Sequence, residues 1–452
     1  MEFGRRKSFS FFEEDWKARA TTAGRTPVHH QHYARSPARE APHTPPRLSL
    51  SSVHGVELPG MSPLHGRVRF PTSPAAIYHC LSALHRLDGD VHALAVARGV
   101  LFTASDSGRV RAWAAPGCFN RGYLDVGRGR VPALAACGGT LVTSHSRDHH
   151  VRVWTVCASA VCDHIRAKKA ATLPAKGGIL SFTKKRPPHH RDTVSCLVLH
   201  AVAGLLYTAS HDRTVKAWKL SDCSCADSFV AHDGAINAML INEADGCIFT
   251  GSADGTVKMW RRVYGGTTHT LIIVLRSELS PVNALTLCHA ATGPTRRCFL
   301  YAGSSDGYVN VWEKEASAGR PGHVGFLKGH RLAVFCLASG CSGRVVVSGS
   351  EDATMRVWRR DGKGGNTSHT CLAVIEGHRG PVRCLAVGGG EAGEVEGSMV
   401  VYSAGLDKSV KDMDTRDEAA VVAEEEAEVV VGLGATPVLS PVWVEKRRTS
   451  RG

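Results

Sequence analysis

Histidine, hydroxyl and aspartate side chains recur together along this sequence, and such a combination could in principle activate a nucleophile. His190, Thr208 and Asp212 form one such set, and Trp218 follows it. In hydrolases of this kind a histidine accepts the proton of the attacking hydroxyl while an aspartate orients the histidine. Here the same residue types return in repeat after repeat, which a single catalytic site would not require. We therefore predict hydrogen bonding within the fold rather than catalysis, and a protein that is not an enzyme.

Pairs of cysteines and histidines raise the question of a metal site. They are Cys223 with Cys225, Cys157 with Cys162, His149 with His150, and His189 with His190. A structural zinc ion needs four ligands, usually supplied as two closely spaced pairs at a characteristic separation. None of these pairs belongs to such a set, so the sequence predicts neither a metal nor any other cofactor.

The histidine-bearing stretches belong to a repeated β-hairpin. In LYTASHDRTVKAW (206–218) a polar turn joins two strand-forming runs, and the second run ends on tryptophan. The segments 249–260, 301–312 and 347–358 repeat this pattern. Aligned on their last residue, the repeats end at Trp113, Trp154, Trp218, Trp260, Trp312, Trp358 and Met413. A period near 40–45 residues is typical of a four-stranded propeller blade, so the sequence predicts an all-β fold with seven blades.

A further strand precedes each hairpin, and its pattern suits the centre of a propeller. Its third residue is small in every repeat: Ala93, Ala133, Cys196, Ala238, Ala284, Cys336 and Cys384. Small side chains fit the innermost strands, which crowd together around the axis. The three cysteines of this set are therefore predicted to fill core positions as small hydrophobic residues, not to act as ligands or nucleophiles.

These repeats resemble the WD40-repeat family from about residue 76 to residue 413. The resemblance implies a buried network in each blade that links aspartate, histidine, a hydroxyl and the tryptophan indole. Three repeats carry all four members: His190, Thr208, Asp212 and Trp218; His232, Thr250, Asp254 and Trp260; and His330, Ser348, Asp352 and Trp358. The remaining sets are incomplete: His378, Ser403 and Asp407 in the seventh, Ser144, Asp148 and Trp154 in the second, Asp306 and Trp312 in the fifth, and Thr103 and Trp113 in the first. The predicted fold is a seven-bladed WD40 β-propeller.

Closing such a ring requires an outer strand for the seventh blade. In this family the first stretch of the domain supplies it, and residues 77–84 (IYHCLSAL) suit that role. Closure removes exposed sheet edges. In the second blade we expect residues 179–182 to form the outer strand, with 156–177 as a basic inserted loop.

The segments before and after the repeats differ from them in composition and are predicted to lie outside the propeller. The 452 residues have a net charge of +14, and residues 1–75 are basic and rich in serine and proline. We predict a disordered basic arm over 1–75 and an acidic and then basic tail over 414–452. No secretory signal or long apolar run occurs, and the 15 cysteines are an odd number. The sequence thus predicts reduced thiols, no membrane span, and a cytosolic or nuclear location.

Partner binding is predicted on one face of the propeller. This face carries the loops that contain His190, His232, His330 and His378, which we call the histidine loops. The candidates in the turns are Asp106, Arg147, His211, Glu351 and Leu406, and those beside the histidines are Arg191, Arg331 and Arg379. Their mixed charges suit a protein or peptide better than a nucleic acid. Within 206–218, His211 is the residue that we expect to face a partner.

A finer similarity is to plant WD-repeat proteins of the Jingubang type, over 237–262, 301–315, 327–338 and 369–387. It implies a plant protein that works as a non-enzymatic adaptor in development or signalling. Its partners would be proteins, such as a transcription regulator or a signalling protein, and the propeller would be a monomer. Two alternatives stay open: a chromatin- or RNA-associated subunit that binds phosphate through the basic arm and loop, and a substrate receptor of a ubiquitin ligase.

Overall fold

The computed structural model describes residues 76–417, apart from 86–87, 158–163, 176–188, 277–279, 291–296, 316–319, 341–342, 364–365 and 389–397. Within these residues the chain forms 28 strands. No helix in this part of the chain is long and apolar enough to cross a membrane. The arm predicted over 1–75 and the tail from residue 418 onward lie outside the described residues.

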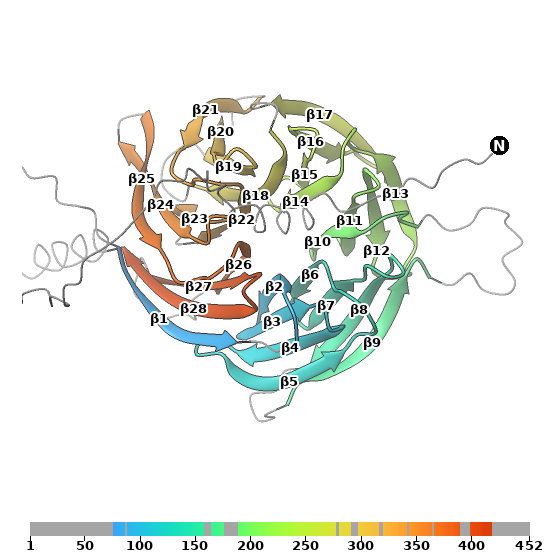
Figure 1. Cartoon of the computed structure of the whole chain (residues 1–452). Helices are drawn as coiled ribbons and strands as arrows, with labels where there is room; N and C mark the ends of the chain where they lie inside the picture. Colours follow the sequence, from blue (N-terminus) through green and yellow to red (C-terminus); the bar gives the residue numbers. More distant parts are fainter. Residues whose placement is uncertain are drawn as a thin grey trace, which may run out of the picture. The chain divides into compact units, whose positions relative to one another are not determined.

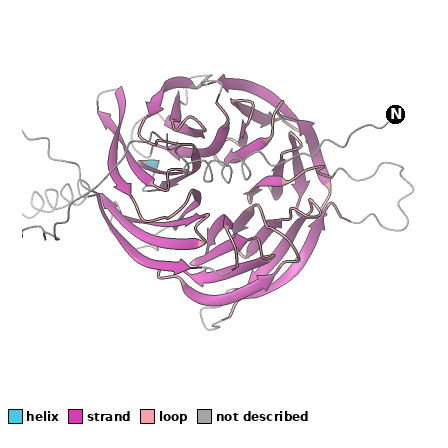
Figure 2. Cartoon of the chain, viewed as in Figure 1, coloured by secondary structure: helices cyan, strands magenta, loops and turns pink. Residues whose placement is uncertain are grey.

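The strands form seven four-stranded antiparallel sheets arranged around an axis, so the fold is a seven-bladed β-propeller (Figure 1, Figure 2). Blade 1 is β2(Val91–Ala97), β3(Val100–Ser105), β4(Arg109–Ala114) and β5(Phe119–Asp125). Blade 2 is β6(Leu134–Cys137), β7(Thr140–Ser144), β8(Val151–Cys157) and β9(Arg166–Leu173). Blade 3 is β10(Val194–His200), β11(Leu205–Ser210), β12(Thr214–Lys219) and β13(Cys225–Val230). Blade 4 is β14(Ile236–Asn242), β15(Cys247–Ser252), β16(Thr256–Arg262) and β17(His269–Arg276).

The other three blades follow the same order from the axis outward. Blade 5 is β18(Val282–His289), β19(Arg297–Ser304), β20(Val309–Glu315) and β21(Gly322–Leu327). Blade 6 is β22(Val334–Gly340), β23(Val345–Ser350), β24(Met355–Lys363) and β25(Asn366–Ile375). Blade 7 is β26(Val382–Gly388), β27(Ser398–Gly405), β28(Ser409–Asp417) and β1(Ala76–His85).

The hydrophobic core lies between the blades rather than within any one of them. Each of seven apolar clusters joins two adjacent blades; one packs Tyr207 and Ala209 of blade 3 against Ile236 and Ile248 of blade 4. The second strand of a blade is covered on both faces, which is why β11 is buried at every residue and its sequence is an almost continuous apolar run. Blade-to-blade contact is close enough that a Cβ on Gly251 would lie 2.7 Å from the side chain of Val282.

The seventh blade closes the ring as predicted. Strand β1, which contains residues 77–84, pairs antiparallel with β28, and Figure 1 shows the blue β1 beside the red β28. Met413 stands where the other blades have tryptophan, lies opposite Cys80 on β1, and is buried in the cluster between blades 6 and 7. A methionine fills this position without requiring a hydrogen-bond partner, so the blade keeps four strands despite the substitution.

The outer strand of blade 2 is not where the sequence predicted it. Strand β9, not 179–182, pairs with β8, so that prediction is wrong, and residues 179–182 lie outside the described part of the chain. An outer strand needs few apolar contacts, and here Ala171 and Leu173 supply them opposite Val153 and Val151. The basic residues before Ala171, which the sequence placed in a loop, therefore belong to an exposed strand edge.

Candidate functional site

In blade 3 the four predicted members of the network are hydrogen bonded in series. Trp218 donates its Nε1–H to Oγ1 of Thr208 at 3.0 Å, and this oxygen lies 2.8 Å from Nε2 of His190. Nδ1 of His190 lies 3.0 Å from Oδ2 of Asp212. Because a carboxylate only accepts, Nδ1 carries the proton, and Nε2 of the neutral ring accepts the O–H of Thr208. The four side chains form one continuous chain of donors and acceptors.

Burial and hydrogen bonding together set the charges in this network. Burial would raise the pKa of the Asp212 carboxyl, but hydrogen bonds from His190, Thr214 and the N–H of Arg191 outweigh it and hold the pKa far below its usual value. Burial lowers the pKa of His190, although Asp212 opposes this effect. At neutral pH the network thus holds an aspartate anion and a neutral histidine. Since Thr208 is completely buried, no substrate can reach its hydroxyl.

The same geometry recurs in blades 4 and 6, and in part in blade 7. Nε2 of the histidine lies close to the hydroxyl in each blade: the distance is 2.8 Å from His232 to Thr250, 2.7 Å from His330 to Ser348, and 2.8 Å from His378 to Ser403. The Nδ1 atoms of these histidines lie 2.9 to 3.0 Å from Asp254, Asp352 and Asp407. Trp260 and Trp358 donate to their hydroxyls at 3.0 and 2.9 Å. The structure therefore brings together all members of the three complete sets and the three polar members of the seventh.

Blade 2 departs from the sequence alignment by one residue. Trp154 donates its indole N–H to Thr143 at 3.1 Å, whereas the hydroxyl of Ser144 bonds the backbone of Ala133. Tryptophan follows its hydroxyl partner by 11 residues here and by 10 in blade 3, because the turn between β7 and β8 is one residue longer. The assignment of Ser144 to the network is thus wrong. Asp148 is not part of it either and instead pairs with Arg152 at 2.5 Å.

A histidine that the repeat pattern did not predict extends the network in blade 2, which has no aspartate member. His145 Nε2 lies 2.9 Å from Oγ1 of Thr143, so this residue of the turn replaces the missing loop histidine. Its Nδ1 is buried without a hydrogen-bond partner among the described residues. Burial, with a smaller contribution from Arg152, lowers the pKa of His145 to about 4. The ring is therefore neutral at physiological pH.

Blades 1 and 5 keep only parts of the network. In blade 1, Trp113 donates to Thr103 at 3.1 Å. Asp106, which precedes the turn position Ser107, lies 2.7 Å from Nε2 of His92. In blade 5 the hydroxyl position is Ala302, and the indole ring of Trp312 instead meets His323 edge to face at 5.5 Å. The networks are thus a property of individual blades and not a requirement for the fold.

The networks hold the histidine loops in place and thereby fix the backbone beside them. The N–H groups of Arg191, Arg331 and Arg379 donate to the carboxylates of the turn aspartates at 2.9, 3.0 and 2.9 Å. The three arginine residues are exposed, and their side chains form no ion pair with any described residue. One face of the propeller therefore presents three guanidinium groups from equivalent positions, each on a backbone tied to a buried network.

The five candidate turn residues differ in their exposure. Asp106 and Arg147 are exposed, whereas His211, Glu351 and Leu406 are half-buried. Burial lowers the pKa of His211; Asp192 opposes this, and Arg383 and Arg130 add to it. His211 is thus more enclosed than expected for a residue that projects toward a partner. Its role in binding stays a prediction.

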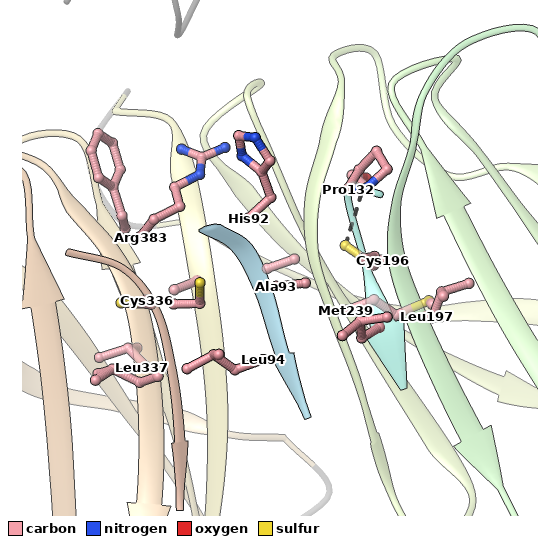
Figure 3. A pocket seen from close by; sticks show the side chains of 18 of the residues that line it. His92, Ala93, Leu94, Pro132, Cys196, Leu197, Met239, Cys336, Leu337 and Arg383 are labelled. Atoms are coloured by element: carbon pink, nitrogen blue, oxygen red, sulfur yellow. Dashed lines mark hydrogen bonds between the residues drawn. The ribbon is translucent and has the colours of Figure 1, made fainter. Parts of the chain in front are cut away.

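A cavity of about 240 Å³ lies on the axis of the propeller and is lined by the inner strands (Figure 3). Six of these strands have a β-bulge at their second residue: His92, Ser195, Asn237, Asn283, Phe335 and Arg383. A bulge redirects the side chain of the extra residue. His92 and Arg383 lie at the same end of the cavity in Figure 3, and the guanidinium of Arg383 lies 5.4 Å from the ring centre of Phe335.

Side chains at or near the bulges also connect neighbouring blades around the axis. Ser195 donates to the carbonyl of Ile236 at 2.5 Å, Asn237 to Val282 at 3.1 Å, and Asn283 to Val334 at 3.2 Å. The thiols of Cys336 and Cys384 continue this ring to Val382 and Val91 at 3.5 and 3.7 Å. Burial raises the pKa of Cys384 to about 12. These cysteines are therefore protonated thiols that pack in the core and act as weak donors between blades.

Two polar contacts between the second strand of one blade and the outer strand of the next were not predicted from the sequence. The hydroxyl of Tyr207 in blade 3 lies 3.2 Å from Nε2 of His269 in blade 4, whose Nδ1 lies 2.8 Å from Asp227. Tyr301 in blade 5 contacts His369 of blade 6 in the same way, at 2.9 Å. In both pairs the tyrosine lies on the second strand of one blade, and the histidine, followed by threonine, lies on the outer strand of the next. The two partners are more than 60 positions apart in the sequence.

The suggested metal ligands do not form a site in the described part of the chain. No group of three or more histidine, cysteine or acidic side chains among these residues could hold a metal ion. Cys157, Cys223 and Cys225 are free thiols, and Cys162 lies outside the described residues.

Comparison with known protein families agrees with the repeated blades and their hydrogen-bond networks. Three segments match the family WD domain, G-beta repeat, at residues 182–219, 223–261 and 321–359. The chain contains WD40 repeats. The three matched segments include the turns and terminal tryptophans of blades 3, 4 and 6, which are the blades with complete networks.

Similar curated proteins cover only parts of the chain. Ribosome biogenesis protein YTM1 of Phaeosphaeria nodorum is 28% identical over 148 residues, which are 32% of this chain and 29% of the relative. Small ribosomal subunit protein RACK1y of Oryza sativa subsp. japonica is 24% identical over 182 residues, 39% of this chain and 50% of the relative. WD repeat-containing protein 18 of Danio rerio is 35% identical over 100 residues, 20% of this chain and 21% of the relative. The chain spans half or less of the length of these relatives.

Proposed function

We propose that this WD40 protein is a non-enzymatic scaffold that binds protein partners on the face carrying the histidine loops. The observation that carries the proposal is the combination of buried networks with exposed arginines at equivalent positions. Each network fixes the loop backbone through an N–H to carboxylate bond, while Arg191, Arg331 and Arg379 stay accessible. A surface that is rigid before binding loses little conformational entropy when a partner docks.

The side chains best suited to catalysis are already engaged within the fold. In blades 3, 4 and 6 the hydroxyl that would be the nucleophile is completely buried and bonded to both histidine and tryptophan. A nucleophile must meet its substrate. These sets do not meet that condition, because Thr208, Thr250 and Ser348 are completely buried. They support a structural role and a scaffold rather than an enzyme.

The charges on the proposed binding face favour a partner with acidic groups on a folded or peptide surface. Arginine binds carboxylates through two parallel hydrogen bonds, which adds geometric selectivity. Asp233 occupies the position beside the histidine in blade 4, and Glu351 lies in a turn of blade 6, so the face is not uniformly basic. A patterned surface of this kind suits a protein better than the continuous phosphate backbone of a nucleic acid.

We further propose that the scaffold acts in developmental or signalling regulation in a plant cell, in the cytosol, the nucleus or both, and as a monomeric propeller. This part of the proposal is supported by the similarity of 237–262, 301–315, 327–338 and 369–387 to plant proteins of the Jingubang type. Its partner would then be a transcription regulator or a signalling protein.

Affinity capture with the full chain tests the scaffold proposal. The test variant reverses two charges on the face, Arg331→Glu with Arg379→Glu, and the matched control reverses two charges on an outer strand, Lys168→Glu with Lys169→Glu. We expect the wild type and the control to retain the same proteins and the test variant to lose them. Retention of the same proteins by all three forms would contradict the proposal. So would nucleic-acid binding with a steep dependence on salt concentration, which is the mark of phosphate contacts.

A further inference from the structure

The outer hairpin of blade 4 exposes an unusual number of apolar side chains. Fifteen large apolar residues are exposed in the described part of the chain, and five of them belong to β16, β17 and the turn between them. These five are Val263, Tyr264, Leu271, Ile272 and Val274. Single exposed apolar residues are normal on a protein surface, but a concentration within one hairpin indicates an interaction site.

Strand β17 forms an open sheet edge with little charge. It is the last strand of its sheet and pairs with no further strand in the described residues. Charge varies among the outer strands: β9 has Lys168 and Lys169, whereas β21 (GHVGFL) has no formal charge. Strand β17 reads HTLIIVLR, has one formal charge on its last residue, and exposes three large apolar side chains, more than any other outer strand in the described residues. An apolar sheet edge with so little charge is the kind of surface to which an extended segment adds as a further strand.

A β-bulge divides β17 and limits how a partner can pair with it. Trp260 lies opposite Leu271 and Met259 lies opposite Ile273, so Ile272 is the extra residue. The bulge interrupts the regular backbone ladder at that point. A partner can therefore form regular backbone hydrogen bonds along 273–276, while Leu271 and Ile272, which are 45% and 44% exposed, offer side-chain contacts.

Positive charge borders the apolar stretch at both of its ends. Arg262, opposite His269, lies at one end and Arg276 at the other. Both residues are exposed and form no ion pair with a described residue. An occupant with acidic residues on both sides of an apolar centre would satisfy both guanidinium groups.

A second copy of the chain fits this charge pattern poorly. If two β17 strands paired antiparallel with Ile272 opposite Ile273, Arg276 of each copy would lie opposite His269 of the other. Because Arg262 is the cross-strand neighbour of His269, each contact would place Arg276 of one copy two strands away from Arg262 of the other, and neither β16 nor β17 has an acidic residue between them. Such a pairing gathers positive charge without an acidic partner, which is unfavourable.

We propose that β17 and its hairpin dock an extended segment of a partner protein whose apolar residues are flanked by acidic ones. The segment adds to the edge of blade 4 along 273–276 and covers Leu271, Ile272 and Val274. This surface lies on the outer rim, apart from the histidine-loop face, and the inference does not depend on the function proposed for that face.

A synthetic peptide tests the inference with the full-length protein. Its sequence alternates valine and threonine in the centre and has glutamates at both ends, and its binding is measured by fluorescence anisotropy. We expect Ile272→Thr with Val274→Thr to weaken binding roughly tenfold or more, since two side chains lose apolar contact area. Threonine keeps the strand propensity of these exposed positions. The matched control is Val324→Thr with Phe326→Thr on β21, which leaves the affinity unchanged.

A change of charge tests the acidic flanks separately. Arg276→Glu should weaken binding of the glutamate-flanked peptide and strengthen binding of an otherwise identical lysine-flanked peptide. Equal binding of both peptides to the wild type would overturn the proposal, as would unchanged affinity in the Ile272→Thr, Val274→Thr variant. Concentration-dependent dimerisation that this variant abolishes would also overturn it, because the occupant would then be a second copy of the chain.

Discussion

Replacement of Thr208 by valine would remove the central hydroxyl of the blade 3 network and change little else. Valine has nearly the shape of threonine, so no cavity is created at this completely buried position. The hydroxyl has two partners, Nε2 of His190 at 2.8 Å and the indole N–H of Trp218 at 3.0 Å. Both would be left without a hydrogen bond inside the protein.

The expected loss of stability follows from these two orphaned groups. A buried polar group without a partner costs roughly 1–3 kcal/mol. Partial rearrangement of the ring and the indole would reduce the sum, so we expect the free energy of unfolding to fall by about 2–4 kcal/mol. This is a large fraction of the total stability of a typical protein, which is about 5–15 kcal/mol.

Equilibrium unfolding in urea, followed by tryptophan fluorescence, measures this loss. Thr155→Val is the matched control, because Thr155 is exposed on β8 and its hydroxyl has no hydrogen-bond partner among the residues that the structure describes. The midpoint of this variant should stay at that of the wild type. A Thr208→Val protein with the wild-type midpoint would refute the argument that the network stabilises the blade. The same result would remove the physical reason for treating the histidine loops as rigid.

Three further predictions concern buried titratable groups and ring closure. Burial lowers the pKa of His145 to about 4, so on acidification the unfolded chain binds a proton at this residue before the folded chain does. The free energy of unfolding should therefore fall by about 2 kcal/mol between pH 7 and pH 5 on account of His145. Urea unfolding at the two pH values should show a smaller decrease for a His145→Gln variant. Asp412 is completely buried; its Oδ2 accepts the N–H of Gly117, but its Oδ1 has no partner among the described residues. Burial raises its pKa, so its ionised form opposes folding at neutral pH. Asp412→Asn should therefore raise the melting temperature at pH 7, and a lower value would contradict this. Deletion of residues 76–85 removes the strand paired with β28 and should lower the melting temperature of the whole propeller, whereas loss of only a minor unfolding step would show that the blades melt independently.

The fold was predictable because its information is local and repeated. A turn aspartate, a hydroxyl and a tryptophan at constant spacing within one hairpin recur in three blades, so each copy supports the interpretation of the others. Ring closure was predictable from the number of repeats, since seven hairpins with their preceding strands leave the strand-forming run 77–84 without a blade of its own. Repetition therefore compensates for the weakness of each individual hairpin signal.

The errors arose where the repeated pattern carries no information. Strand β9 is assigned by pairing with β8, and its one fully buried side chain is Leu173, which is too weak a pattern to separate it from 179–182. In blade 2, one additional turn residue shifted the hydroxyl from Ser144 to Thr143, because counting back from tryptophan assumes a constant turn length. The contacts of Tyr207 with His269 depend on how adjacent blades pack, and no spacing within a hairpin encodes them.

The distribution of the networks also indicates where a partner should first be sought. A loop histidine bonded to a turn aspartate is present in blades 3, 4, 6 and 7, and the residue after it is arginine in all but blade 4, which has Asp233. Blades 6 and 7 are neighbours in the ring, so Arg331 and Arg379 are the two fixed arginines on adjacent blades, whereas Arg191 of blade 3 has Asp233 of blade 4 as its neighbour on one side. A short acidic segment reaches guanidinium groups on adjacent blades with fewer residues than it needs to reach across the ring. For this reason the charge reversals are placed on Arg331 and Arg379, and a partner that ignores them would have to bind through a different part of the surface.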